Sequence, residues 1–342
     1  PDVPLAAADR NTRSVSNLAL ERAVDYAKAF DSFALIVVHR ERVQIEWYAD
    51  YWQAERLTQS QSMHKTLVAL AAGIAIDEGA IAGVDVPIGT YITEWADDPR
   101  GRITLRQLLV MSSGLRRYGF TFNPFAGESS FRFLNTGDRI GVLLATPLEW
   151  TPGTRYEYND VNAALVGLVV ERATGRRYAD YLQEKIWQPM GGASAAVWLD
   201  RDDGFAMTAC CMLAPAMDWA RIGILVKNRG RVGATQIVPA DWVEAMTAPN
   251  ELNPAFGYFT WLAENETLEK SQVVDRDASE EAFLDPNLIM LRGYGGQRVY
   301  ISRAYDLVIV RLGPFSGYQP LKPGWQDTYL FNGLVRGLRS AE

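Results

Sequence analysis

The chain has 342 residues, a formal net charge of -7 at pH 7, 48% hydrophobic residues and 22% charged residues. These proportions are ordinary for a globular protein with a real core and exclude an intrinsically disordered chain. The acidic balance and the absence of a Lys/Arg-rich run argue against a nucleic-acid-binding protein, which needs a concentrated basic face.

The chain holds two cysteines, Cys210 and Cys211, and two histidines, His39 and His64. A bridge between neighbouring cysteines is strained, and there is no second pair to build a disulfide framework. Because no His, Cys and carboxylate side chains cluster at ligand spacing, we expect neither a metal nor a cofactor. No apolar run reaches the roughly 18 residues that span a bilayer. The sequence from Pro1 onward has no signal-peptide segments, so the compartment stays open.

The first part of the chain predicts a helix followed by a hairpin. Apolar residues recur at helical spacing over residues 18–30. The dense apolar run 32–38 and the alternating run 43–48 predict two strands, joined by a polar turn over residues 39–42. We therefore expect an antiparallel sheet that starts early in the chain.

A long helix is predicted from Ser62 to about Glu78. One flank is a continuous apolar stripe, made of Leu67, Leu70, Ala71, Ile74 and Ala75. The other flank carries small or functional side chains, namely Ser62, Lys65, Thr66, Ala69 and Gly73. We expect this second flank to face a cleft.

Helical patterns dominate the middle of the chain, and strand patterns return near its end. The helical segments are residues 105–111 and 161–174. The later strand patterns cover residues 256–262, 297–302 and 306–312, and a final helix is predicted over residues 328–338.

This order of elements predicts an α+β fold. The length exceeds the usual size of one domain, so an inserted subdomain is expected. Strands at both ends predict one discontinuous α/β subdomain, residues 1–82 and 216–342, whose antiparallel sheet is flanked by helices. Residues 83–215 would form a mainly helical insertion, and we expect the active site where the two meet.

The motif Ser62-Met63-His64-Lys65 is the only Ser-x-x-Lys in the chain. In the first turn of a helix, Ser62 and Lys65 lie on one face, within hydrogen-bonding reach. A serine hydroxyl becomes a nucleophile when a neighbouring base, such as an amine, accepts its proton. Serine and lysine at this spacing occur by chance roughly once in such a chain, so an N-cap serine followed by a solvated lysine is the alternative.

Two further segments narrow this choice. Residues 152–160 read Pro-Gly-Thr-Arg-Tyr-Glu-Tyr-Asn-Asp before a helical pattern, and residues 292–297 read Arg-Gly-Tyr-Gly-Gly-Gln at a strand pattern. With the Ser-x-x-Lys motif in this order, the chain resembles the serine β-lactamase and penicillin-binding-protein superfamily. The similarity is greatest to its class C-like branch, with the family VIII esterases and the 6-aminohexanoate-dimer hydrolases. It covers essentially the whole chain and implies a β-lactamase/transpeptidase-like fold.

The resemblance implies a role for each residue of the three motifs. Ser62 would be the acylated nucleophile, Lys65 its partner, and Tyr158 the tyrosine of the Tyr-x-Asn motif. The backbone N–H groups of Ser62 and Tyr294 would donate to the oxyanion. Without the other motifs, Tyr158 would be interpreted as a core tyrosine under a turn.

The protonation state of Lys65 determines whether it can act as a base. To be neutral near pH 7, its pKa must fall by roughly 3 units, at a cost of about 4 kcal/mol, through burial or a nearby positive group. We expect the crowded helix flank to supply the burial. Tyr158 beside that amine would share the proton, as base toward Ser62 and then as acid toward the leaving group. His64 should pack beside the helix and not act in a triad.

The glycine-rich segment around Tyr294 has two interpretations. Gly293, Gly295 and Gly296 are typical of a strand entry or bulge. In the functional interpretation, Gly293 and Gly295 bind substrate, because their missing side chains let a substrate backbone approach the strand edge. An oxyanion donor such as the Tyr294 N–H is worth about 2.7–4 kcal/mol in a comparable hydrolase.

The chain departs from the family pattern in two motifs. Relatives usually have Lys-Thr-Gly or His-x-Gly in the late strand, whereas residues 291–293 here are Leu-Arg-Gly. The apolar Leu291 weakens the case for antibiotic recognition, although Arg292 would partly substitute. The Tyr-x-Asn motif ends in Asp160, as in the similar motif of aminohexanoate-oligomer hydrolases. Asp160 keeps an acceptor but loses an amide donor, and we expect it to bind substrate.

Three further features bear on the cleft. The aromatic loop of residues 116–125 should border it, with Tyr118 facing the substrate, although a surface-loop aromatic is the alternative. Cys210 and Cys211 lie where relatives often have glycines, and we expect them to serve in packing. No segment corresponds to the glutamate with which class A β-lactamases activate the deacylating water, so that step would use Lys65 and Tyr158.

The leading hypothesis is a serine hydrolase that cleaves a small ester or amide through a Ser62 acyl-enzyme. The first alternative is a β-lactamase or D-alanyl-D-alanine carboxypeptidase, and the second is a non-catalytic, penicillin-receptor-like binding protein. The expected partner is a small-molecule ester or amide, with no nucleic acid and no membrane span. The oligomeric state is left open.

Overall fold

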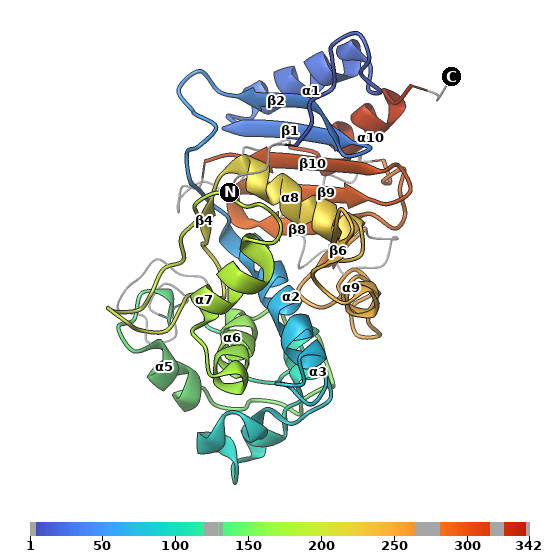
Figure 1. Cartoon of the computed structure of the whole chain (residues 1–342). Coiled ribbons are helices and arrows are strands. Elements are labelled where there is room, and N and C mark those ends of the chain that lie inside the picture. The colour runs from blue at the N-terminus through green and yellow to red at the C-terminus, as the bar shows by residue number, and fades with distance from the viewer. Residues whose placement is uncertain (1–4, 120–128, 130–132, 264–280, 315–324, 340–342) are drawn as a thin grey trace.

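The computed structural model describes residues 5–119, 129, 133–263, 281–314 and 325–339. Its centre is a six-stranded sheet in the order β2-β1-β10-β9-β8-β7, and all neighbouring strands are antiparallel (Figure 1). The strands are β1 (Ala34–His39), β2 (Arg42–Tyr48), β7 (Trp261–Leu262), β8 (Ile289–Gly293), β9 (Gln297–Ser302) and β10 (Leu307–Leu312). The first hairpin of the chain therefore pairs with strands from its last sixth.

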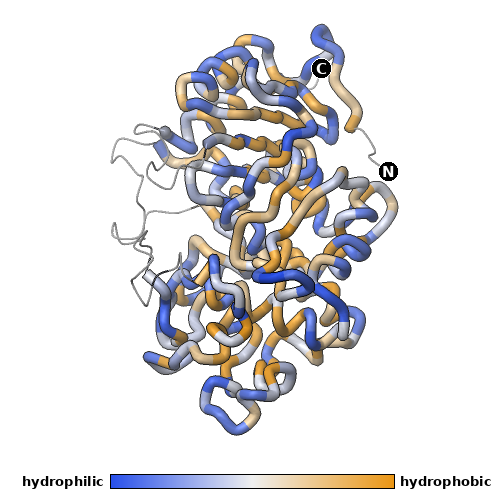
Figure 2. Tube along the Cα trace, turned by 90° about the vertical axis from the view of Figure 1, so that its left-hand side faces the viewer, coloured by the Kyte–Doolittle hydropathy of each residue, from blue (hydrophilic) through white to orange (hydrophobic). Residues whose placement is uncertain are grey.

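The sheet is covered by helices on both faces, which explains its nearly continuous apolar strands. Helix α8 (Ala216–Lys227) packs on one face, and α1 (Asn17–Ala29) and α10 (Asp327–Arg336) pack together near the other (Figure 1). In β10, Val308 and Val310 join the core shared with α8, whereas Leu307 and Ile309 join the core shared with α10. Figure 2 shows that hydrophobic segments are concentrated inside the molecule.

Helix α2 (His64–Asp77), preceded by the 3-10 turn η1 (Gln61–Met63), runs from the sheet into the helical part of the molecule (Figure 1). Every residue of α2 from His64 to Ala75 is buried. A helix that is apolar on all sides needs neighbours on all sides. Those neighbours include α6 (Asp160–Thr174), α7 (Tyr178–Leu182) and α9 (Ala240–Met246).

The expectation that the small-residue flank of this helix faces a cleft is wrong for most of its length. The indole N–H of Trp242 donates to the Ala69 carbonyl at 2.9 Å. A Cβ on Gly73 would lie 2.1 Å from Cδ1 of Trp242, so glycine is required for this approach. The small residues therefore accommodate α9, and the N-terminal end of the helix is the part that contributes to the candidate site.

The remaining elements are short. The helices are η2 (Ile88–Thr90), η3 (Thr93–Trp95), η4 (Pro99–Arg102), α3 (Leu105–Leu109), α5 (Arg139–Ala145) and η5 (Gln183–Trp187). Two-residue strands pair as β3 (Thr58–Gln59) with β4 (Leu213–Ala214) and β5 (Arg231–Val232) with β6 (Thr235–Gln236). In the part of the chain that the structure describes, no helix is both long and apolar enough to cross a bilayer.

The α+β fold with an antiparallel sheet flanked by helices is confirmed, but two strand predictions need correction. The predicted strand over residues 256–262 is reduced to β7, whose two residues pair with β8. Strand β8 was not predicted, because its five residues are too few to show a period. The division into subdomains at residues 82 and 216 stays a prediction.

Candidate active site

Ser62 lies in η1, where several backbone contacts hold the chain. The N–H of Ser60 donates to the carbonyl of Met212 at 2.8 Å, and the N–H of Cys211 donates to the carbonyl of Gln61 at 3.0 Å. Gln61 has a φ of 50°, an unfavourable conformation for a non-glycine residue that surrounding contacts must enforce. Ser62 itself stays half-buried, so it can be reached from outside.

Lys65 connects the predicted nucleophile with residues from two distant segments. Its Nζ donates to Oγ of Ser62 at 2.9 Å and to the carbonyl of Ala209 at 2.5 Å. The same Nζ lies 2.8 Å from Oδ1 of Asp160 and 5.0 Å from the ring centroid of Tyr158. The four predicted side chains Ser62, Lys65, Tyr158 and Asp160 thus meet around one buried amine.

The sequence left open whether Lys65 or Tyr158 holds the proton, and predicted only that the helix flank buries Lys65. Burial does lower the pKa of Lys65, but the nearby Asp160 carboxylate and Tyr158 raise it by more, so the net pKa is higher than usual. The burial expected from the sequence is therefore present, but it does not make this amine neutral. A buried ammonium with a carboxylate partner keeps its proton.

Tyr158 and Asp160 are held in place at the start of α6 by the residue between them. Asn159 is the N-cap of that helix, and its Oδ1 accepts from the N–H of Val161 at 3.1 Å. Its amide group donates to the carbonyl of Leu115 at 2.9 Å. One buried asparagine therefore caps the helix and ties it to a neighbouring loop. A polar residue before a helical pattern is the signal from which this role could have been found.

The ring of Tyr158 is enclosed by aromatic side chains from after α9. It stacks on Trp261 at 5.7 Å between centroids and meets the edge of Phe256 at 6.1 Å. Stacked and edge-on aromatic contacts of this kind restrict the ring to one orientation. No sequence pattern identified Trp261 as a neighbour of the site, because the contact depends on where the short edge strand β7 lies.

The glycine segment lies beside the nucleophile, because β8 packs against η1. A Cβ on Gly293 would lie 2.3 Å from the carbonyl oxygen of Ser60, so only glycine allows this approach. Gly295 and Gly296 have φ values of 74° and 78°, which favour glycine. Tyr294, between Gly293 and Gly295, is 39% exposed.

Two side chains considered for substrate binding are engaged elsewhere. The hydroxyl of Tyr118 lies 3.1 Å from Oγ1 of Thr146, and its ring stacks on Phe133 at 5.3 Å. Its substrate role stays a prediction, and residues 120–125 of that loop lie outside the described residues. Arg292 lies over the ring of Trp261 at 5.2 Å and 4.0 Å from Asp327, which weakens its proposed role as a substitute cation.

Cys210 and Cys211 form a disulfide bond between neighbouring residues. The expectation that they serve only in packing is therefore incomplete. The bond closes the turn that follows Ala209, whose carbonyl accepts from Lys65. The carbonyl of Cys210 also accepts from Nδ1 of His64 at 3.1 Å.

His64 packs beside the helix, as expected from the sequence. It is fully buried, and its Nε2 lies 3.0 Å from the hydroxyl of Tyr178. Because a carbonyl can only accept, Nδ1 carries the proton and Nε2 is left to accept from the phenol. Burial lowers the pKa of His64 to about 4, so the ring is neutral near pH 7. Across the described ranges, no three His, Cys, Asp or Glu side chains gather as a metal site.

Comparisons with known proteins identify relatives of this chain. Among curated proteins, the chain is 25% identical to the 6-aminohexanoate-dimer hydrolase of Paenarthrobacter ureafaciens, over 63% of this chain and 57% of that protein. It is 31% identical to an Escherichia coli O157:H7 protein provisionally named D-alanyl-D-alanine carboxypeptidase, over 40% of this chain and 32% of that protein. The chain thus spans between about a third and three fifths of these relatives' lengths.

Solved structures are similar over nearly the whole chain. A family VIII carboxylesterase matches with a TM-score of 0.68 at 16% identity, covering 95% of this chain and 99% of its own. A penicillin-binding protein from Bacillus halodurans matches with a TM-score of 0.65 at 15% identity, covering 94% and 100%. At such identities the similarity establishes the fold alone.

The family is decided by a match to the sequence itself. The model of the family described as Beta-lactamase matches residues 19–313, which is most of the chain and includes all three motifs. The chain belongs to the Beta-lactamase family.

Proposed function

We propose that this protein is a serine hydrolase that cleaves a small ester or amide through an acyl-enzyme on Ser62. The observation that carries the proposal is the 2.9 Å contact between Nζ of Lys65 and Oγ of Ser62, with Asp160 on the same amine. A protonated amine donating to Oγ stabilises negative charge on that oxygen during attack.

The proton of the serine hydroxyl needs an acceptor other than a charged Lys65. We assign this role to Tyr158, whose side chain hydrogen-bonds with Lys65 and whose ring centroid lies 5.0 Å from Nζ of Lys65. In acylation, a deprotonated Tyr158 acts as the base: Oγ of Ser62 bonds to the substrate carbonyl carbon, and its proton passes to the phenolate oxygen of Tyr158. The phenol then gives that proton to the leaving group as the ester or amide bond breaks.

The negative charge that develops on the carbonyl oxygen needs hydrogen-bond donors. We assign this role to the backbone N–H groups of Ser62 and Tyr294, because β8 packs directly against η1. Deacylation reverses the proton path: water gives a proton to Tyr158 as it attacks the acyl carbon, and Ser62 recovers a proton as it leaves.

The substrate class is proposed from the chemistry of the site and from the names of the relatives. One relative is named for hydrolysis of an aminohexanoate dimer, a linear amide, and one similar structure is a carboxylesterase. Leu291 is fully buried in the core, where the family's lysine or histidine would face a carboxylate. A linear ester or amide is therefore favoured over a β-lactam.

The experiment compares the wild type with Ser62→Ala on short-chain nitrophenyl esters and on linear amide dimers. We expect Ser62→Ala to lose at least about 10³-fold in kcat while it melts at the wild-type temperature. Hydrolysis that survives in a folded Ser62→Ala protein would exclude the proposal.

Assays on the same protein preparation distinguish two alternative functions. Turnover of nitrocefin faster than that of any ester or amide would favour a β-lactamase, and the name of the Escherichia coli relative is the reason to include D-alanyl-D-alanine peptides. A burst of one product equivalent without steady-state turnover would favour a penicillin-receptor-like binding protein.

A further inference from the structure

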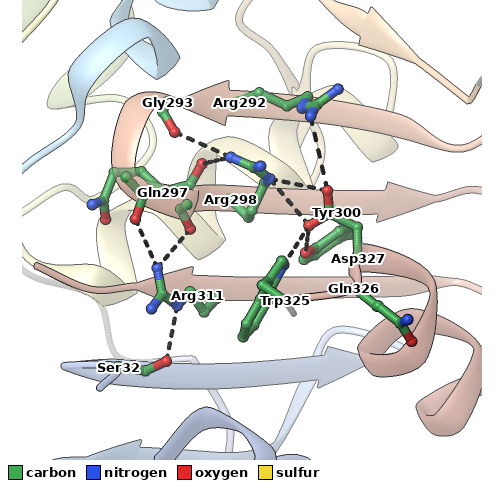
Figure 3. A network of polar contacts seen from close by, with 12 residues as sticks. Ser32, Arg292, Gly293, Gln297, Arg298, Tyr300, Arg311, Trp325, Gln326 and Asp327 are labelled. Carbon is green, nitrogen blue, oxygen red and sulfur yellow. Dashed lines mark hydrogen bonds and ion pairs between the residues drawn. The ribbon is translucent and has the colours of Figure 1, made fainter. Parts of the chain in front are cut away.

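Three arginines lie directly opposite one another on neighbouring strands of the sheet. Arg292 on β8 pairs with Arg298 on β9, and Arg298 pairs with Arg311 on β10. Figure 3 shows the row, with its side chains on the sheet face where Asp327 of α10 lies. We call Arg298 and Arg311 the arginine clamp.

Without compensating contacts, the two arginines of the clamp would destabilise the folded protein. Like charges directly opposite in an antiparallel sheet repel, and burying a guanidinium removes its hydration. Arg311 is fully buried and Arg298 is 5% exposed. Burial, followed by the neighbouring Arg298, lowers the pKa of Arg311 to about 10. Such an arrangement persists only where the guanidinium groups make compensating contacts.

Those contacts converge on the turn that carries Tyr294. Nη1 of Arg298 donates to the carbonyls of Gly293 and Gln297, both at 3.1 Å. Nη1 of Arg311 donates to the carbonyls of Gly295 and Gly296, both at 3.0 Å. Two side chains therefore hold four of the five carbonyls between residues 293 and 297.

The Nε atoms of both guanidinium groups make hydrogen bonds to other parts of the fold. Nε of Arg311 donates to Oγ of Ser32 at 2.8 Å, just before β1. Nε of Arg298 donates to Oδ1 of Asp327 at 3.1 Å. Asp327 is also bound by the hydroxyl of Tyr300 at 2.5 Å. The clamp thus links the turn to the segment before β1 and to the start of α10.

Peptide geometry connects these contacts with the active site. The Gly293 carbonyl and the Tyr294 N–H belong to one planar trans peptide unit, so they point in opposite directions. Nη1 of Arg298 binds this carbonyl at 3.1 Å, so the N–H on the same peptide unit points away from Arg298. Gly293 approaches the Ser60 carbonyl beside the nucleophile.

We propose that Arg298 and Arg311 are positioning residues that fix the 293–297 turn and thereby aim the Tyr294 N–H at the oxyanion. This inference rests on the proposed hydrolase function and extends it to side chains on the far face of the sheet. It requires that loss of the clamp weakens the transition state more than the substrate complex, because the N–H contacts the oxygen fully only when charge develops.

The test is the steady-state kinetics of Arg298→Lys and Arg311→Lys on a nitrophenyl ester. Lysine keeps the charge but loses the planar guanidinium, in which Nη1 binds two carbonyls while Nε binds the anchor. We expect kcat to fall about 10- to 100-fold with KM within about twofold, since small misplacements near the reacting atoms cost up to about 10²-fold. Binding of a boronic acid that forms a tetrahedral adduct with Ser62 should weaken in parallel with kcat/KM.

The matched control is Arg221→Lys. Arg221 is also a buried arginine, but it pairs with Asp218 at 2.6 Å on α8, which covers the other face of the sheet. Its substitution should change the melting temperature without changing kcat. If the clamp variants do not fold, Ser32→Ala removes a single anchor of Arg311 and should lower kcat by a few-fold at unchanged KM.

The kinetic results distinguish failure of the positioning role from failure of the proposed hydrolase function. Clamp variants that fold and keep the wild-type kcat, or in which KM rises while kcat stays constant, would overturn the inference alone. If Ser32→Ala is the variant measured, an unchanged kcat overturns it equally. A wild type without Ser62-dependent turnover would remove the proposed function, and the inference with it.

Discussion

Oδ1 of Asp160 lies 2.8 Å from Nζ of Lys65, and this contact determines the charge beside the candidate nucleophile. Lys65 is almost completely buried, whereas the Asp160 side chain is 30% exposed. A buried amine without a carboxylate would lose its proton, and with one it keeps it. Although burial lowers the pKa of Lys65, the Asp160 carboxylate raises it beside Ser62.

Asp160→Asn tests this relationship. It removes the carboxylate but leaves the burial, so the pKa of Lys65 should fall from its raised value. If the charged amine is the active form, the alkaline limb of the kcat/KM profile moves to lower pH in the variant. The measurement is ester hydrolysis from pH 5 to 10, and Asp85→Asn, which breaks an exposed ion pair with Arg106, should leave the profile unchanged.

The opposite result would identify another mechanism. If Asp160→Asn is more active than the wild type at neutral pH, neutral Lys65 is the base, and the role given to Tyr158 is wrong.

Gly293→Ala tests the approach of β8 to η1. The φ of Gly293 is -122°, which alanine adopts freely, so the cost comes entirely from the added methyl group against the Ser60 carbonyl. We expect a loss of about 1–3 kcal/mol in the free energy of unfolding, and of about 10²-fold in kcat/KM. Urea denaturation and steady-state kinetics measure the two effects.

A second glycine provides the control for that variant. A Cβ on Gly333 in α10 would meet no atom within 4 Å. Gly333→Ala should therefore stabilise the protein by about 0.5–1 kcal/mol and leave activity unchanged. Wild-type kinetics in Gly293→Ala would mean that the two segments can separate without affecting the site.

Asn159 offers a test of how Tyr158 and Asp160 are positioned. Asn159→Ala removes both the helix cap and the hydrogen bond from the side-chain amide to the Leu115 carbonyl. We therefore expect it to lower the free energy of unfolding by about 2–4 kcal/mol. Asn159→Ser keeps a capping oxygen and should cost less. Chemical denaturation of the two variants separates the contributions, and equal stability of both would show that the cap contributes little.

His64 predicts a pH dependence of stability. Its pKa is about 4 in the folded protein and 6.5 for an unperturbed histidine, so the unfolded chain binds more protons between these values. The contribution of neutral His64 to the free energy of unfolding is complete above pH 6.5, and it is lost as the pH falls toward 4. We expect about 2 kcal/mol less stability at pH 5 than at pH 7 from this residue.

His64→Gln should reduce that dependence when urea denaturation is compared at the two pH values. Some dependence remains, because burial also lowers the pKa of His39. If the wild type and His64→Gln lose the same free energy of unfolding between pH 7 and pH 5, protonation of His64 does little to destabilise the folded protein.

Local sequence patterns were sufficient for several elements. The strand over residues 297–302 and the final helix were predicted to within two residues, because each has a clear period. The pairing of Ser62 with Lys65 also follows from local geometry, since residues three apart share a helix face. The family followed from three motifs in order, and the family match confirms it.

Other features could not be predicted from local sequence patterns. The approach of Trp242 to Gly73 depends on how α9 packs, and the stack of Trp261 on Tyr158 depends on the edge of the sheet. The sequence identified Arg292 as a possible substrate cation, but packing directs it toward Asp327.

By itself the sequence determined the local contact between Ser62 and Lys65, the candidate reactive pair, because helix spacing is a property of neighbouring residues. Only the tertiary structure decided that Lys65 is charged, because its pKa depends on burial and on a carboxylate from another segment. The structure also placed two arginines from the far face of the sheet behind the Tyr294 turn. Electrostatic and steric effects act through space, so they can be assigned only once distant segments have been brought together.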